Sequence, residues 1–244
     1  MANKKQEKKV SIQHNLPVKV SQYLDVGKSG RGVCAGDSCN EFWAKRVCGP
    51  ASLAMVTAYY FSKNEPSVVG AISKIYPRRL RKSGLSDGVR HSSESSDRQK
   101  SSEKNSENNS LKKLSEFLVD FTISDGIENG AYIENIGWSH QGLIDTAVKH
   151  FGLIGKRFDF AKENPETAFE RMIEELKNGP VIASIYKNLN PQNGGHLAVV
   201  FGTDEGNVLF ADPDIDNPSF IERKATLEEF KNGWKKRYIV IRPE

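Results

Sequence analysis

The sequence predicts an α+β fold, because every helical pattern lies before residue 178 and the apolar strand patterns all follow it. Residues 49–60 carry apolar side chains at helical spacing, and Pro50 suits a first helical turn because its missing N–H would be unpaired there. Residues 181–186 and 196–202 are β-branched, largely apolar runs bounded by Gly, Pro and Asn, which is typical of buried strands. Helices and strands that are grouped rather than alternating favour the α+β class.

Further elements follow from the same rules. Apolar residues recur at helical spacing from Leu143 to Phe151, and Ser139 precedes this run as a candidate N-cap. Two more strands are predicted at residues 207–211 and 237–241, and the turn at residues 204–206 is short enough for a hairpin. The other predicted helices span residues 67–76, 111–121 and 165–177.

One segment differs sharply in composition from the rest of the chain. From about residue 81 to 113 the sequence consists of Ser, Glu, Lys, Asn, Asp and Arg with hardly any apolar residues, so it lacks the apolar surface that would offset its ordering entropy. We therefore expect residues 81–113 to be a disordered insertion in the helical part. Residues 1–39 are expected to form an N-terminal arm and loop, and residues 40–244 a single domain.

Cys48 is the first candidate for chemistry, because it stands directly before the predicted helix at residues 49–60. The positive end of a helix dipole favours a thiolate over a thiol, and Gly49 lets a substrate backbone come close. Taken alone, such a cysteine is more often a small buried residue before a core helix. A nucleophile also requires a base.

His196 and Asp212 supply the missing groups. His196 begins one predicted strand and Asp212 follows the end of the next, so a hairpin between the two strands brings the histidine and the aspartate together. Pro213 keeps Asp212 extended. A cysteine at a helix start, a histidine and an aspartate are the nucleophile, base and orienting acid of thiol catalysis.

Composition and charge limit the binding partners and the cellular compartment that we expect. The net charge is only +4, with 35 basic against 31 acidic residues dispersed along the chain, so a nucleic-acid partner is not expected. No stretch approaches the ~18 apolar residues of a membrane span, and the lysine-rich N-terminus lacks the apolar core of a secretory signal. We expect a cytoplasmic protein without a membrane span; the oligomeric state is not predicted.

The other two cysteines, Cys34 and Cys39, lie five residues apart in a loop rich in turn-forming residues. They either close a small disulfide or remain loop thiols, and a reducing cytosol favours free thiols. Cysteine and histidine spacings typical of zinc sites do not occur in the sequence, so neither a metal nor another cofactor is expected.

Several blocks of the sequence resemble one family, the double-glycine leader peptidases that process bacteriocins, and their stand-alone relatives among the papain-like cysteine peptidases. The resemblance runs from about residue 40 to the C-terminus, interrupted by the insertion. It implies a papain-like helical lobe that carries the cysteine, packed against an antiparallel sheet that carries the histidine and aspartate. The blocks are CGPASLAMV, GWSHQGLIDTAVKHFGL, GPVIASIY followed by GGHLAVVFG and ADPD, and FKNGWKKRYIVI.

By this resemblance, Cys48 would attack the carbonyl of a peptide or protein substrate, His196 would exchange protons and Asp212 would fix the imidazole. Cleavage after small residues such as Gly-Gly is also implied by the family alone. Two alternatives stay open: acyl transfer or deamidation by the same three residues, and a catalytically silent module that grips peptides.

One position departs from the family pattern. Papain-like enzymes usually have a glutamine six residues before the cysteine, where it helps to hold the oxyanion, and here that position is Phe42. The nearest upstream amide is Asn40, which becomes the candidate oxyanion donor beside the backbone N–H of Cys48. Phe42 is also the feature that keeps the silent-module alternative open.

Overall fold

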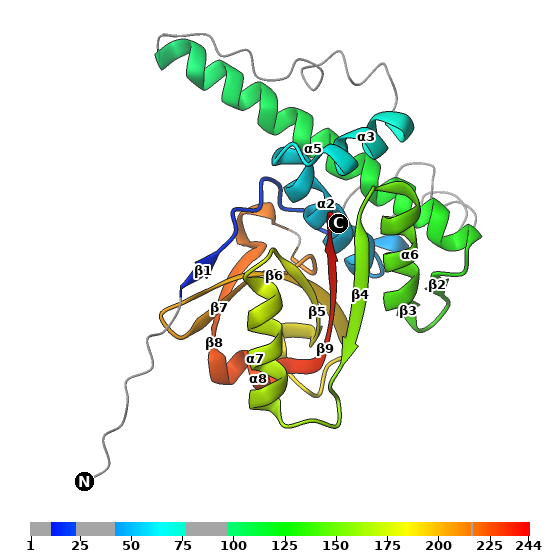
Figure 1. Ribbon diagram of the computed structural model, residues 1–244. Helices are drawn as coiled ribbons and strands as arrows, with labels where there is room; N and C mark the ends of the chain where they lie inside the picture. Colours follow the sequence, from blue (N-terminus) through cyan, green and yellow to red (C-terminus); the bar gives the residue numbers. More distant parts are fainter. Residues whose placement is uncertain (1–10, 23–41, 77–96, 216) are drawn as a thin grey trace.

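The computed structural model describes residues 11–22, 42–76, 97–215 and 217–244. Within these residues, seven strands form one antiparallel sheet in the order β4-β9-β5-β6-β7-β8, with β1 added beside β6. The helices α2, α3, α5 and α6 gather into a helical lobe on one side of this sheet, and α7 and α8 lie on the other (Figure 1).

The described helices are α2 (Cys48–Ser62), α3 (Pro66–Ile75), α5 (Asp97–Glu128), α6 (His140–His150), α7 (Pro165–Leu176) and α8 (Leu227–Gly233). The large sheet consists of β1 (Ile12–Gln13), β4 (Ile154–Asp159), β5 (Val181–Tyr186), β6 (Gly195–Asp204), β7 (Asn207–Ala211), β8 (Glu222–Thr226) and β9 (Trp234–Arg242). A separate hairpin pairs β2 (Tyr132–Ile133) with β3 (Gly137–Trp138). Short 3₁₀ turns span η2 (Lys187–Leu189) and η3 (Pro218–Phe220).

The sheet is covered on both faces, which explains why its central strands are almost continuously apolar. Successive side chains of β6 point to opposite sides: Val199 packs with α2 and α5, whereas Ala198 and Val200 pack with α7 and α8. β5 alternates in the same way between Ile182 and Ala183. The predicted central strands are therefore confirmed, and β5 and β6 pair antiparallel with Ala183 opposite Ala198.

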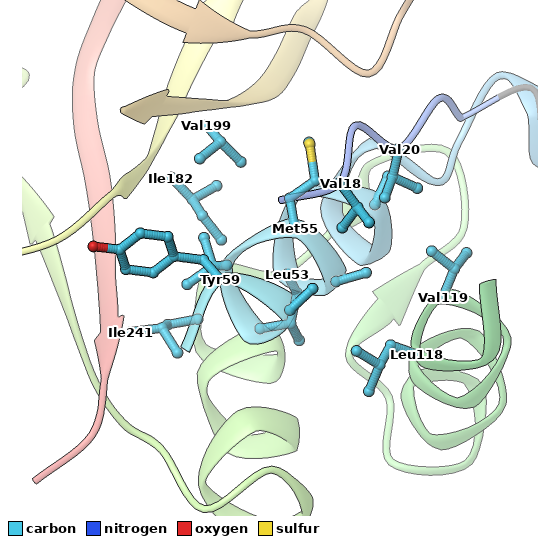
Figure 2. Packing of buried hydrophobic residues seen from close by; sticks show 14 of the residues in the cluster. Val18, Val20, Leu53, Met55, Tyr59, Leu118, Val119, Ile182, Val199 and Ile241 are labelled. Carbon is cyan, nitrogen blue, oxygen red and sulfur yellow. The ribbon is translucent and has the colours of Figure 1, made fainter. Parts of the chain in front are cut away.

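Helix α2 lies between the sheet and the rest of the helical lobe, and every side chain from Gly49 to Tyr60 is buried. Figure 2 shows Met55 and Tyr59 on this helix, with Ile182 of the sheet on one side and Leu118 of α5 on the other. A helix enclosed on all sides needs apolar residues all round instead of an amphipathic stripe. This packing holds the N-terminus of α2, and with it Cys48, rigidly against the sheet.

The N-terminal arm is part of the domain where it is described. Ile12 and Gln13 pair with Thr203 and Gly202 of β6, and further along the arm Leu16, Val18 and Val20 are buried in the main core. Residues 11–22 are thus packed on the same core as the other described residues.

The expectation of disorder between residues 81 and 113 was wrong for its second half. Residues 97–113 form the first turns of α5, the helix that continues to Glu128. Leu111, Leu114 and Leu118 are buried in the core, so the packed half of the helix provides a nucleus onto which residues of adequate helix propensity add at little cost. Residues 81–96 lie outside the described part of the chain.

Two strands that the sequence analysis missed lie at the ends of the sheet. β4 and β8 read IGKRFD and ERKAT, and each pairs with one neighbour in the sheet order. Charged side chains on an edge strand oppose pairing with other chains, but they also remove the apolar pattern by which strands are predicted.

Candidate functional site

Cys48 is the first residue of α2, and its thiol lines a cleft between the helical lobe and the sheet. The cleft has a volume of about 550 Å³. One turn further along α2, Ser52 Oγ donates a hydrogen bond to the carbonyl of Leu197 at 3.4 Å, which ties the helix to the strand that begins with His196. The helix start and the strand start are thereby held next to each other.

His196 and Asp212 form a buried pair. His196 Nε2 donates to Asp212 Oδ1 at 2.7 Å, and the two side chains are 1% and 2% exposed. They come from neighbouring strands, as predicted: His196 is the second residue of β6, and Asp212 directly follows β7. Because Nε2 is taken by the carboxylate, Nδ1 is the ring nitrogen left for the thiol of Cys48, which hydrogen-bonds with this histidine.

The pKa values follow from these contacts. Burial alone would raise the pKa of Cys48, but the hydrogen bond and charge of His196, with backbone hydrogen bonds from Leu197 and Gly49, lower it below its ordinary value. Burial alone would lower the pKa of His196, and the hydrogen bonds to Asp212 and Cys48 outweigh it and raise the pKa to about 10. These contacts shift the pair toward the thiolate of Cys48 and the imidazolium of His196.

Asp212 has further partners that the sequence analysis did not identify. Arg223 of β8 donates from Nη1 to Asp212 Oδ2 at 2.8 Å, and the backbone N–H of Asp214 donates to Oδ1 at 3.0 Å. Burial would raise the pKa of Asp212, but the bonds to His196, Asp214 and Arg223 lower it. Arg223 lies on a charged edge strand, where the sequence offers no sign that one arginine differs from its neighbours.

The N-terminal arm supports the turn after Asp212. The backbone N–H of Gln22 donates to the carbonyl of Pro213 at 2.8 Å, its side-chain amide donates to Asp214, and Ser21 Oγ donates to the carbonyl of Ile215 at 2.7 Å. Gln22 is fully buried, and its side-chain oxygen has no hydrogen-bond partner among the described residues. Residues 16–22 do carry a signal of this packing in the sequence, because their alternating apolar residues end in a polar one.

Trp138 fixes the turn that precedes Cys48. Its indole Nε1 donates to the carbonyl of Arg46 at 2.6 Å. The ring lies so close to Gly49 that a Cβ there would be 2.8 Å from the Trp138 side chain, and a Cβ on Gly126 of α5 would be 2.2 Å from it. Both glycines are thus required by the close approach of the Trp138 ring, which clamps the hairpin of β2 and β3 against the start of α2 and against α5.

His140, the first residue of α6, also lines the cleft, with Nε2 at 2.8 Å from Ser184 Oγ. Burial, together with Arg237 and Arg157, lowers the pKa of His140 and keeps it neutral. Asn40, the candidate oxyanion donor, and the cysteines Cys34 and Cys39 lie outside the described residues.

Phe42 stands where the family usually has a glutamine, and its ring packs against other aromatic rings instead of donating a hydrogen bond. Its ring is in edge contact with Trp43 at 5.1 Å, and the Arg46 guanidinium lies 4.0 Å from the ring centre. The position that usually supplies an oxyanion donor is here part of an aromatic cluster.

A buried histidine between a cysteine and a carboxylate, built on a helical lobe and an antiparallel sheet, defines the class of papain-like cysteine peptidases. Residues 37–240 match the model of the Peptidase_C39 like family, and the chain belongs to this family of papain-like cysteine peptidases. The predicted fold class, α+β with a helical lobe and an antiparallel sheet, is confirmed.

Solved structures with a similar course of the chain include peptidases from two transporters. The peptidase domain of Streptococcus ComA, a transporter involved in quorum sensing, is 17% identical, with a TM-score of 0.42 over 82% of this chain and 93% of that one. A double-glycine motif protease from an AMS/PCAT transporter, solved in complex with the leader peptide, is 16% identical, with a TM-score of 0.43 over 97% and 100%. A putative C39-like peptidase from Bacillus anthracis is 15% identical, with a TM-score of 0.45 over 96% and 98%.

No curated protein matches the chain. Among the described residues, no helix is both long enough and apolar enough to cross a membrane.

Proposed function

We propose that this protein is a cysteine peptidase that hydrolyses a peptide bond through an acyl-enzyme on Cys48. The observation that supports it most is the continuous contact from the thiol through His196 to Asp212, in which the pKa of the cysteine is lowered and that of the histidine is raised. A structural cysteine requires neither a buried histidine nor a carboxylate behind it.

The proposed steps follow from the positions of these atoms. The thiolate Sγ of Cys48 attacks the substrate carbonyl carbon and forms a tetrahedral intermediate, whose oxyanion lies at the N-terminus of α2 within reach of the Cys48 backbone N–H. His196 then gives its proton to the leaving amine as the carbon–nitrogen bond breaks, which leaves a thioester. Water, deprotonated by His196, attacks the thioester and releases the acid.

Asp212 keeps the imidazole oriented and favours its protonated form, and Arg223 holds the second oxygen of the carboxylate. This arrangement also supports an enzyme over a silent binding module, because burying a charged aspartate beside the histidine contributes nothing to gripping a peptide. Family membership supports small residues, with Gly-Gly foremost, before the cut bond.

The first test is labelling with an electrophilic peptide that ends in Gly-Gly, followed by mass spectrometry of the native chain, Cys48→Ala and His196→Ala. We expect an adduct on Cys48 in the native chain at pH 6. At this pH a thiol with the ordinary pKa of 9.0 is only about 0.1% thiolate, so His196→Ala should react about a hundredfold to a thousandfold more slowly. Equal labelling of all cysteines, independent of His196, would overturn the proposal.

Hydrolysis can be separated from acyl transfer with the same protein. A thioester on Cys48 that decays at the same rate with and without added amines indicates hydrolysis. An acyltransferase would instead pass most of the acyl group to the amine.

A further inference from the structure

The cleft beside Cys48 is lined by basic side chains without acidic ones. Lys45, Arg46, Lys235 and Arg237 all contribute to its wall, and none of the lining residues described is an aspartate or glutamate. The chain as a whole is nearly balanced in charge, so this concentration of cations is local. It also lies on both sides of the reacting pair.

Lys45 and Arg46 stand in the turn directly before Cys48. The Arg46 guanidinium lies over the Phe42 ring and donates to the Phe42 carbonyl at 2.9 Å, so its position is fixed. Lys45 is exposed, and neither residue forms an ion pair with a carboxylate in the described part of the chain.

Lys235 reaches the opposite wall because of an irregularity in β9. Ile185 of β5 pairs with Trp234, whereas the preceding Ser184 pairs with Arg237, so two residues of β9 are extra at this point. The second of them, Lys236, has a φ of 56°, a left-handed conformation that lysine rarely adopts. Such bulges re-aim side chains and occur beside active sites.

The bulge directs the side chains of Lys235 and Lys236 to different places. Lys236 Nζ turns outward and donates to the Glu163 carbonyl at 2.8 Å. Lys235 Nζ instead lies 4.7 Å from the centre of the Tyr186 ring, and a Cβ on Gly195 would be 2.7 Å from this nitrogen. The ammonium group of Lys235 is therefore placed beside the residue that precedes His196.

Three of these four cations have no carboxylate partner among the described residues. Arg237 is paired with Asp159 at 2.9 Å, which leaves Lys45, Arg46 and Lys235 as the excess. The thiolate of Cys48 does not depend on them, because the lowered pKa of Cys48 comes from His196 and backbone N–H groups. What remains is a positive field at the mouth of the cleft, which attracts anions.

We infer that the cleft selects peptides with acidic side chains close to the scissile bond, whose carboxylates pair with Lys45 and Lys235. This inference rests on the proposed peptidase function and adds the substrate class to it. Lys45 precedes α2 in the helical lobe and Lys235 lies on β9 of the sheet, so a peptide in the cleft between lobe and sheet meets a cation from each. Ile136, which is 81% exposed, also lines the cleft and offers a peptide an apolar contact.

The test uses the full chain with Cys48→Ala and three rhodamine-labelled decapeptides that share a central Gly-Gly and carry Glu, Gln or Lys on both sides of it. Binding is measured by fluorescence anisotropy. At about 0.05 M salt the Glu peptide should bind about tenfold more tightly than its Gln isostere, and the difference should shrink toward twofold at about 0.5 M salt. The Lys peptide should bind more weakly than both.

Charge-reversal variants test whether Lys45 and Lys235 cause the preference for the Glu peptide. Adding Lys235→Glu or Lys45→Glu should remove most of the preference for the Glu peptide, whereas Lys74→Glu, which makes the same charge change on the exposed face of α3, should leave it unchanged. Equal binding of the three peptides, an equal effect of Lys74→Glu, or tighter binding of a single-stranded oligonucleotide of the same charge would overturn the inference.

A separate measurement keeps this inference distinct from the proposed function. Iodoacetamide is small and uncharged, so its reaction with Cys48 of the native chain at pH 6 reports the thiolate and not the cleft charges. Fast alkylation without any preference for Glu peptides would refute the acidic selectivity alone. Slow alkylation with a clear preference would refute the thiol catalysis alone.

Discussion

Replacing Arg223 by methionine tests how much the support of Asp212 contributes to the domain. The Arg223 guanidinium donates to Asp212 Oδ2 at 2.8 Å, while Oδ1 is occupied by His196 and by the backbone N–H of Asp214. Methionine keeps much of the aliphatic length and removes only the charge and the donors. The variant therefore leaves a buried carboxylate without the partner of its second oxygen.

The magnitude can be bounded from burial. Removing one member of a fully buried ion pair costs about 3–5 kcal/mol, and a hydrogen bond to a charged group contributes about 1.5–3 kcal/mol. The Asp212 side chain is 2% exposed but that of Arg223 is 29% exposed, so water compensates part of the loss. We expect the free energy of unfolding to fall by about 2 kcal/mol near neutral pH.

Urea unfolding of the native chain and of Arg223→Met measures this difference, with Lys224→Met as the control. Lys224 is the next residue of the same strand, and its ion pair with Asp204 at 3.2 Å is largely exposed, with 50% and 40% of the two side chains accessible. An exposed pair contributes little, so the control should lose less than about 0.5 kcal/mol.

The stability difference between the native chain and Arg223→Met should also depend on pH. Folding lowers the pKa of Asp212 below 3.8, so its contribution to stability is present above pH 3.8 and is lost as the pH falls through the folded-state pKa. Without Arg223 the folded-state pKa is less depressed, and the gap between the native chain and the variant should therefore narrow in acid. Equal losses in Arg223→Met and Lys224→Met, or a gap that stays constant down to acid pH, would refute the reasoning.

Two further predictions concern the reacting pair and its clamp. Folding raises the pKa of His196 from 6.5 to about 10, so its contribution to stability is lost as the pH rises above 6.5, whereas folding lowers the pKa of Cys48 from 9.0, so its contribution is gained as the pH rises toward 9. Cys48→Ala removes the gain and keeps the bond of His196 to Asp212, so urea titrations should show its stability falling relative to the native chain as the pH rises toward 9; parallel curves for the two proteins would contradict this. In thermal unfolding, Gly126→Ala should destabilise the protein by about 1–3 kcal/mol, because the added methyl group meets the Trp138 ring. The control Gly70→Ala lies in a helix with open space around it and should stabilise the protein by about 0.5–1 kcal/mol. Changes of the same sign in both variants would contradict the proposed clamp.

The helix start at Cys48 and the hairpin that joins His196 to Asp212 were predictable because they are encoded locally. A proline in the first turn, apolar residues at helical spacing, and two apolar runs with a short turn between them determine these elements through neighbouring residues alone. The structure confirms both elements and brings the three side chains into contact.

The helix at residues 97–113 and the edge strands β4 and β8 show where such reasoning failed. In each, the local sequence is polar, and the structure arises from what lies next to it: the packed half of α5 in one case and the neighbouring strands in the other.

The sequence by itself determined the class of the fold and three residues of the candidate site, because periodicity and turn chemistry act over a few positions. Only the tertiary structure decided which residues support them. Arg223 reaches Asp212 across paired strands, Trp138 of β3 closes on Gly126 of α5, and a bulge in β9 turns Lys235 toward Gly195. These contacts join residues distant in sequence, and their energies depend on burial and distance, neither of which a linear pattern contains.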